Sequence, residues 1–254
     1  MTTIYSHSIR HKLFIALGFD ELEYAITDNN FNKLSSGKYA TTDFEMFESV
    51  LTNTKELNEI YNGTTVIFCG SNALCHPSTF INTAERKKLY SASYRLKSSE
   101  TICKGSISDD ITISYSADSK ILDLVKQKFP NLVYQHDLEV FVKYILKEIK
   151  PSGTSISLSN MGEYTLMVVS DAQKLLLMNQ FYTKDLQDVF YFTMLAIEQL
   201  DLDIEKLTLN WIQNDDFGKW EDVNLLFKDY IRTVQNVQVP QTYHSALTMA
   251  IACE

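Results

Sequence analysis

The apolar and polar positions of the first 70 residues predict three strands, a helix and a fourth strand. Strict alternation is typical of a half-buried strand, and an uninterrupted β-branched run is typical of a buried one. The expected strands are residues 12–17, 22–26, 33–40 and 64–68. Thr42 and Glu45 have the spacing of a capping box, so we expect a helix to begin there and to end at Gly63.

The middle of the chain is less regular and ends in an amphipathic helix. A short polar helix is expected over residues 82–94, and Asp118 is placed to cap a second helix that Pro130 stops. Apolar residues then recur at helical spacing over residues 137–149. The strands expected in this region are residues 101–107, 110–116 and 132–134.

A compact Pro151-Ser152-Gly153 break divides the chain, and we place the domain boundary there, with domains at residues 1–150 and 151–254. Thr183 is expected to cap the longest helix, and a later helix is expected over residues 220–234. The strands expected in this half are residues 154–158, 164–169, 174–181, 207–212 and 237–239.

The two halves repeat the same order of elements. Strand, strand, strand, capped helix and strand recur at an offset that stays near 141 residues. Self-similarity on this scale indicates an internal duplication, with chance as the alternative because three strands and a helix form a common string. The sequence therefore predicts an α/β protein with two mixed sheets.

Composition and charge exclude several classes. Hydrophobic residues make up 45% of the chain and charged residues 22%, which excludes dominant disorder. The formal net charge of -9 argues against nucleic acid as a partner, because such proteins carry a basic stripe. With only four arginines and 8 glycines, the chain is poor in the residues that usually hold phosphate.

The sequence also bears on location. No apolar run approaches the roughly 18 residues of a membrane-spanning helix, and the first ten residues lack the apolar segment of a secretory signal. The four cysteines are scattered without a C-x-x-C pair, so we expect reduced thiols. Together these features predict a cytoplasmic protein.

A duplicated βββαβα unit is the plan of the actin-like ATPase fold, which consists of two ribonuclease-H-like halves. Residues 175–181, and the helix end at residues 198–203, resemble a bacterial family of unknown function assigned to that fold. Residues 113–135 are similar to the same family. The matching motifs are structural, so the resemblance implies the fold and no activity. By fold, the nearest functional relatives are actin-like proteins of pilus-assembly and secretion platforms.

The resemblance also implies where a nucleotide would bind. In such ATPases each phosphate hairpin carries an acidic residue followed closely by glycine. Here the first hairpin keeps Gly18 without the acid, and the second has Asn160 and Gly162, again without it. The adenosine stretch, residues 213–218, has one glycine instead of a pair. Gly18, Asn160 and Gly162 are thus the candidate cofactor-binding residues, with plain hairpin glycines as the alternative, and we expect no ATP or Mg²⁺ cofactor.

Other candidate sites are weak. Asp215-Asp216 offers oxygen ligands for a cation, and Cys69, Cys75 and His76 fit no zinc signature. No nucleophile motif is present, so we expect neither catalytic residues nor a metal site. Residues 190–192 put more aromatic surface on one helix than one face buries, so contact with the other half or a partner is one interpretation.

Two functions remain. The favoured hypothesis is a non-catalytic binding or scaffold module with a degenerate nucleotide site. Its partner would be another protein, and a homo-oligomer is also open. The alternative is a nucleotide-binding actin-like ATPase that serves a pilus-assembly or secretion-type platform. On the first hypothesis the chain is not an enzyme.

Overall fold

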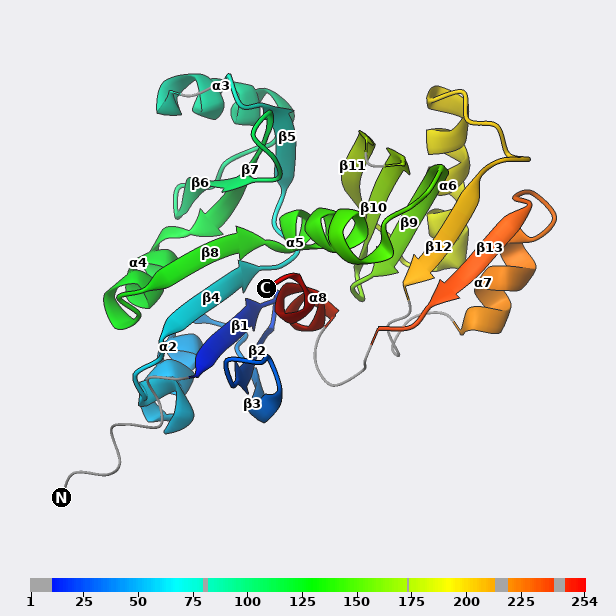
Figure 1. Ribbon diagram of the computed structural model, residues 1–254. Helices are drawn as coiled ribbons and strands as arrows, with labels where there is room; N and C mark the ends of the chain where they lie inside the picture. The colour runs from blue at the N-terminus through cyan, green and yellow to red at the C-terminus, as the bar shows by residue number, and fades with distance from the viewer. Residues whose placement is uncertain (1–10, 80–81, 173, 213–218, 240–244) are drawn as a thin grey trace. The chain divides into compact units, whose positions relative to one another are not determined.

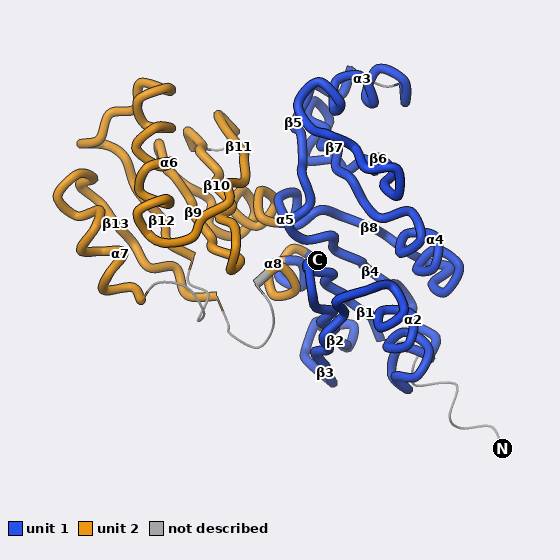
Figure 2. The backbone as a smooth tube through the Cα atoms, turned by 180° about the vertical axis from the view of Figure 1, so that it is seen from behind, with its two compact units in different colours: residues 1–140, 250–252, 254 blue, residues 141–249, 253 orange. Residues whose placement is uncertain are grey.

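The computed structural model describes residues 11–79, 82–172, 174–212, 219–239 and 245–254 (Figure 1). The chain divides into two compact units (Figure 2). Unit 1 comprises residues 1–140, 250–252 and 254, and unit 2 comprises residues 141–249 and 253. The division falls inside a helix that precedes the Pro151-Ser152-Gly153 segment.

Unit 1 is built on a five-stranded mixed sheet in the order β3-β2-β1-β4-β8. The first three strands form an antiparallel meander, and β4 and β8 run parallel to β1. Helices α2 and α4 contact each other. The bounds are β1 Lys12–Leu17, β2 Glu21–Thr27, β3 Lys33–Ala40, α2 Phe44–Asn53, η1 Glu56–Asn58, β4 Gly63–Phe68, α4 Ser119–Lys128 and β8 Leu132–His136.

A second, three-stranded antiparallel sheet is inserted in unit 1 between β4 and α4, in the order β5-β7-β6. Its elements are β5 Ala73–Pro77, α3 Thr83–Ser93, β6 Glu100–Ser106 and β7 Ile111–Asp118. The sequence predicted β6, β7 and α3 and missed β5. This strand alternates weakly and pairs only with the distant β7, so its residues carry little local signal.

Unit 2 repeats the first sheet in the order β11-β10-β9-β12-β13. Figures 1 and 2 show α6 and α7 on one face of it, where Val189, Val223 and Phe227 join Leu209 and Trp211 in the core. The remaining bounds are α5 Asp137–Tyr144, η2 Ile145–Ile149, β9 Thr154–Asn160, β10 Tyr164–Asp171, β11 Lys174–Tyr182, α6 Leu186–Gln199, β12 Thr208–Ile212, α7 Trp220–Phe227, β13 Thr233–Val237 and α8 Ser245–Cys253.

The prediction of two mixed sheets is confirmed. Each of these two sheets has five strands, and the units share finer details. A bulge interrupts the second strand pair of each meander, between Ile26 and Thr27 and between Val169 and Ser170. The turn after the middle strand of each meander, β2 or β10, contains a residue other than glycine with a left-handed backbone. This residue is Phe31 in unit 1 and Ala172 in unit 2.

Several predicted boundaries were wrong. The helix predicted over residues 220–234 ends at Phe227, because the chain turns at Tyr230 and Val234 belongs to β13. The last strand is therefore Thr233–Val237 instead of residues 237–239. The predicted caps Thr42 and Thr183 give way to Asp43 and Asp185, whose carboxylates accept the first backbone N–H groups. None of the helices in the described ranges is long and apolar enough to cross a membrane.

Candidate functional site

The first candidate hairpin joins β1 to β2, and residues 18–21 lie between its last strand pair, Leu17 with Leu22. The Gly18 N–H donates to the Glu21 carbonyl at 2.9 Å, and the Thr41 N–H donates to the Asp20 carbonyl at 2.8 Å. A Cβ added to Gly18 would lie 3.2 Å from Glu21 Cγ, so the Glu21 side chain would have to move by a few tenths of an ångström. The backbone conformation of Gly18 does not require glycine.

A pocket of about 180 Å³ adjoins this hairpin, and acidic groups dominate its polar lining. It is lined by Leu17, Gly18, Phe19, Glu21, Thr41, Thr42, Asp43, Phe44, Phe47, Asp118 and Ile121. Three carboxylates and no lysine or arginine are among these residues. Its volume is below the roughly 300–1,000 Å³ of typical small-molecule sites.

The amino ends of α2 and α4 meet this pocket, and both are capped by their own chain. Asp43 accepts the Met46 N–H at 2.8 Å, and Asp118 accepts the N–H groups of Lys120 and Ile121 at 2.9 and 3.2 Å. The amino end of a helix attracts phosphate because its N–H groups are unsatisfied and its dipole is positive. Here carboxylates already accept three of those N–H groups, and their charge would repel a phosphate.

The second candidate hairpin joins β9 to β10 through residues 161–164, after the strand pair Asn160 with Thr165. Its main-chain bonds repeat those of the first hairpin. The Met161 N–H donates to the Tyr164 carbonyl at 2.8 Å, and the Thr183 N–H donates to the Glu163 carbonyl at 3.0 Å.

The polar groups of Asn160 are engaged within this hairpin. Asn160 is 1% exposed, and its Nδ2 donates to Thr165 Oγ1 at 3.0 Å and to Thr183 Oγ1 at 3.2 Å. Its Oδ1 accepts the Gly162 N–H at 2.7 Å. Both Nδ2 hydrogens of Asn160 are thus donated within the hairpin, so a phosphate could accept a hydrogen bond from this side chain only if one of these bonds broke.

The two hairpin glycines are not equivalent, which corrects the sequence comparison. Gly18 is the first of four loop residues, whereas Gly162 is the second and has a φ of 92°. Only Gly162 therefore needs glycine for its backbone. The position equivalent to Asn160 is Leu17. Gly18 lies in unit 1 and the other two candidates lie in unit 2.

Comparison with known proteins identifies the family of this chain. A family model described as "Protein of unknown function (DUF3822)" matches residues 2–234. The chain belongs to this family. A search of curated proteins finds none that matches the DUF3822 chain.

Solved structures show the fold of the DUF3822 chain. A Bacteroides thetaiotaomicron protein, described as having an actin-like ATPase fold and unknown function, is similar over 100% of both chains with a TM-score of 0.86 and 15% identity. A structure of the PilM-PilN type IV pilus biogenesis complex is similar over 95% of this chain and 98% of that chain, with a TM-score of 0.57 and 10% identity. The predicted actin-like ATPase fold is confirmed.

Sequence analysis missed a buried histidine–aspartate pair in the DUF3822 chain, at the carboxyl end of β8. His136 and Asp137 have fully buried side chains, with Nδ1 and Oδ1 2.9 Å apart. Asp137 Oδ2 accepts the Gly70 N–H at 3.1 Å, and His136 Nε2 lies 2.9 Å from the Ser71 carbonyl, to which it donates. The pair fixes the loop after β4. Its only sequence signal was that His136 directly precedes an amphipathic helix.

The thiol candidates of the DUF3822 chain do not form a reactive or metal-binding site. Burial raises the pKa of Cys69 well above its usual range, with a smaller contribution from Asp137, and burial also raises the pKa of Cys75. His76 is engaged by Ser114 at 2.8 Å. Within the described ranges no three His, Cys, Asp or Glu side chains are grouped to hold a metal ion. Residues 213–218, with Asp215 and Asp216, lie outside the described residues.

The aromatic run of α6 divides between core and surface. Phe190 packs on Phe227 with ring centroids 5.3 Å apart, and Phe192 stacks on Phe181 at 4.3 Å. Tyr191 between them is 60% exposed. That part of this run contacts the other half or a partner stays a prediction.

We expect Gly162→Ala to destabilise the DUF3822 chain by about 1–2 kcal/mol, because a left-handed backbone strains any residue with a Cβ. Gly153→Ala is the matched control. Neither glycine has an atom within 4 Å of an added Cβ, and only Gly162 has a positive φ. The control should be neutral or slightly stabilising. Urea unfolding followed by circular dichroism measures both, and equal effects would contradict the backbone argument.

Proposed function

We propose that this chain is a non-catalytic actin-fold module that binds another protein, and that its nucleotide site is degenerate. The observation that carries the proposal is that the polar groups around both hairpins are already paired within the chain. Asp43 and Asp118 occupy the helix ends beside the first hairpin, and the Asn160 amide is engaged by Thr165 and Thr183 in the second.

Charge supports the same proposal. Nucleotide binding needs cations or free N–H groups to offset phosphate charge. The pocket beside the first hairpin instead holds Glu21, Asp43 and Asp118. Glu21 already pairs with Lys38 at 2.8 Å. A net charge of -9 adds a repulsive background to any anionic ligand.

A structural neighbour supports the role of binding another protein. The similar structure of the PilM-PilN complex is, by its description, an assembly of two proteins in type IV pilus biogenesis. It has this fold and a length close to that of the present chain. The fold is therefore compatible with a protein partner.

The alternative is an actin-like ATPase that serves a pilus-assembly or secretion-type platform. One observation favours it: a pocket does lie beside Gly18, at the carboxyl end of β1. Phosphate would have to displace two capping carboxylates there. We therefore rank this alternative second.

We expect Mg-ATP to leave the thermal unfolding of the full chain unchanged, and ATP hydrolysis to stay at the rate of buffer. A ligand at 100 times its Kd would add about 2.7 kcal/mol of stability, which is a readily measured shift in Tm. Differential scanning fluorimetry and calorimetry at millimolar Mg-ATP provide the measurement. A low-micromolar Kd that is lost in Asn160→Ala, while the variant keeps its fold, would establish the ATPase alternative and overturn the proposal.

A further inference from the structure

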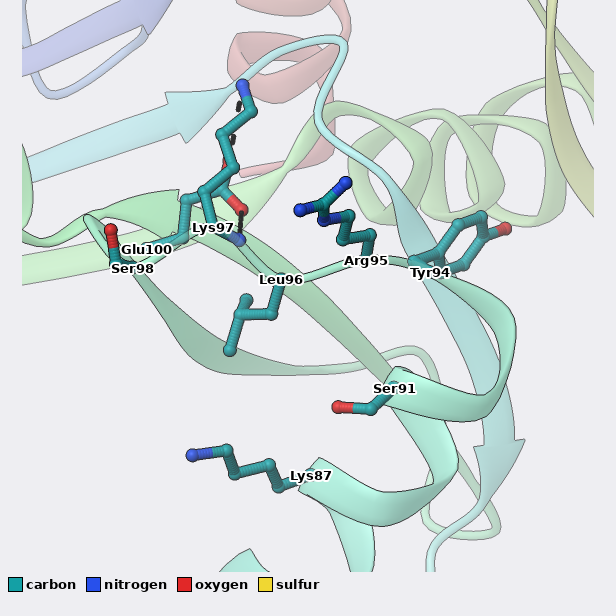
Figure 3. A pocket seen from close by; sticks show the side chains of 8 residues that line it. All are labelled: Lys87, Ser91, Tyr94, Arg95, Leu96, Lys97, Ser98 and Glu100. Carbon is teal, nitrogen blue, oxygen red and sulfur yellow. Dashed lines mark hydrogen bonds and ion pairs between the residues drawn. The ribbon is translucent and has the colours of Figure 1, made fainter.

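A basic pocket lies in the inserted part of unit 1, between the end of α3 and the start of β6. Its volume is about 490 Å³ (Figure 3). We call it the α3–β6 pocket. It is lined by Lys87, Ser91, Tyr94, Arg95, Leu96, Lys97, Ser98 and Glu100. The volume is within the range of ligand-binding clefts.

The charge of this region is opposite to that of the whole chain. Five basic residues fall between Arg86 and Lys97, and no acidic residue occurs from Arg86 to Ser99, in a chain of net charge -9. Lys87 and Arg95 are exposed, and neither has an ion-pair partner within the part of the chain that the structure describes. The pocket therefore presents cations that the chain itself does not neutralise.

The single carboxylate of the pocket is engaged by its own loop. Glu100 accepts the Lys97 N–H at 3.0 Å and lies 3.8 Å from Lys97 Nζ. Its side chain is 18% exposed, whereas that of Lys97 is 79% exposed. Glu100 thus fixes the loop, and Lys97 still faces solvent.

The wall of the pocket is anchored to the inserted sheet. The Tyr94 hydroxyl donates to the Ala73 carbonyl at 3.2 Å, and the Tyr90 hydroxyl donates to the Asn72 carbonyl at 2.9 Å. The two rings lie 5.3 Å apart. Because α3 is tied to the start of β5 in this way, the pocket is a preformed feature with a half-buried apolar residue, Leu96, in its lining.

We propose that the α3–β6 pocket docks an acidic segment of a partner protein, whose carboxylates meet Lys87 and Arg95 while an apolar side chain packs on Leu96. Arginine binds carboxylates in a bidentate geometry, and clusters of basic residues recognise acidic motifs. This inference rests on the proposed function, because it names the kind of partner.

The spacing of the cations favours a peptide over a single small anion. In Figure 3 the Lys87 side chain extends on one side of Leu96, and the Arg95 and Lys97 head groups lie on the other. A peptide with several carboxylates and an apolar side chain can satisfy both the cations and Leu96, whereas a lone phosphate has no apolar part. Nucleic acid is disfavoured because the charge of the whole chain repels a long polyanion.

The test selects peptides without assuming a sequence. A phage-displayed library of random 12-residue peptides is panned on the full chain, without any selection against the variants. Binding of the enriched peptides is then measured by fluorescence anisotropy. K174E/K228E is the matched control, because it makes the same change in charge at exposed lysines of unit 2. All four positions are exposed, so circular dichroism should show unchanged folds.

We expect enriched peptides to carry several acidic residues around an apolar one. Their binding should weaken about tenfold or more in K87E/R95E, stay within about twofold in the control, and weaken as salt rises. At every salt concentration, Leu96→Ser should bind the peptides more weakly than the unchanged chain does. Enrichment of neutral or basic peptides, no enrichment, or equal loss in both variants would overturn the proposal. Displacement by inorganic phosphate or an oligonucleotide at matched charge would also overturn it.

This outcome is separable from the fate of the proposed function. Mg-ATP binding that depends on Asn160 overturns the non-catalytic module whether or not peptides bind. If the peptide selection fails and Mg-ATP also has no effect, only the docking proposal for the α3–β6 pocket is overturned. The proposed non-catalytic module is then unaffected.

Discussion

Truncating Trp211 to alanine should destabilise unit 2 by about 3–5 kcal/mol, because a fully buried aromatic side chain leaves a cavity that its neighbours cannot fill. Trp211 is 0% exposed and lies on β12, where it pairs with Leu158 of β9 and Asn236 of β13. It belongs to the core that α6 and α7 cover. Hydrogen exchange by mass spectrometry should show lost protection in unit 2.

Two variants separate cavity formation from other effects of this substitution. Leu225→Ala removes a side chain that is 63% exposed on α7, and it should change stability by about 0.5 kcal/mol or less. Trp211→Phe keeps most of the volume. It also removes an indole N–H that has no hydrogen-bond partner within the described residues, so it should cost less than half as much as alanine. Equal losses for Trp211→Ala and Leu225→Ala would contradict the assignment of Trp211 to the core.

Replacing Gly105 by alanine should destabilise unit 1 by about 2–3 kcal/mol, because β6 has no room for a Cβ at this position. The added atom would overlap Glu139 Oε2 and would lie 2.7 Å from Ile113 Cγ2. Ile113 is 0% exposed and Glu139 is 3% exposed, so neither has solvent to move into. Urea unfolding measures the loss, and hydrogen exchange should assign it to unit 1.

A double-mutant cycle tests the source of this strain. Glu139→Ala removes the overlapping carboxylate, so Gly105→Ala should cost clearly less in that background, with a coupling of about 1 kcal/mol or more. Gly63→Ala is the matched control, because an added Cβ there meets no atom within 4 Å. Additive effects of Gly105→Ala and Glu139→Ala would show that the carboxylate is not what excludes the methyl group.

The order of elements along the chain could be predicted because both halves carry clear local patterns. The alternating apolar and polar residues of the meanders and the buried run over residues 64–68 identify strands, and the repeat then indicates the second sheet. The first residues of the helices were harder to predict from the sequence. Thr183 suits a cap by type, but its hydroxyl pairs with Thr165 across the hairpin, and Asp185 takes the capping role. Only the folded chain decides between two neighbouring oxygen-bearing side chains.

The positions of the two candidate hairpins could be predicted from the sequence, but the hydrogen bonds within them could not. Sequence placed Gly18, Asn160 and Gly162 in the two hairpins, as the structure does. The sequence did not indicate that the Asn160 amide is hydrogen-bonded. Its acceptors, the hydroxyls of Thr165 and Thr183, come close to it only when the strands pair. The α3–β6 pocket could not be predicted from the sequence either. Residues 82–94 read as a polar helix, and the concavity depends on how Tyr94 docks on β5.

The paired hairpin bonds have an evolutionary consequence. The bonds donated by residues 18 and 41, and by residues 161 and 183, join main-chain atoms only. They survive nearly every substitution except proline, so apart from Gly162, whose φ requires glycine, selection for folding places little constraint on the side chains at the loop tips. The loop residues of each half of a duplicated fold can then change independently, so that a loop that once bound a ligand can come to bind something else. Descendants that share the sheets need not share an activity, and ancestry is best traced in the strands and function in the loops.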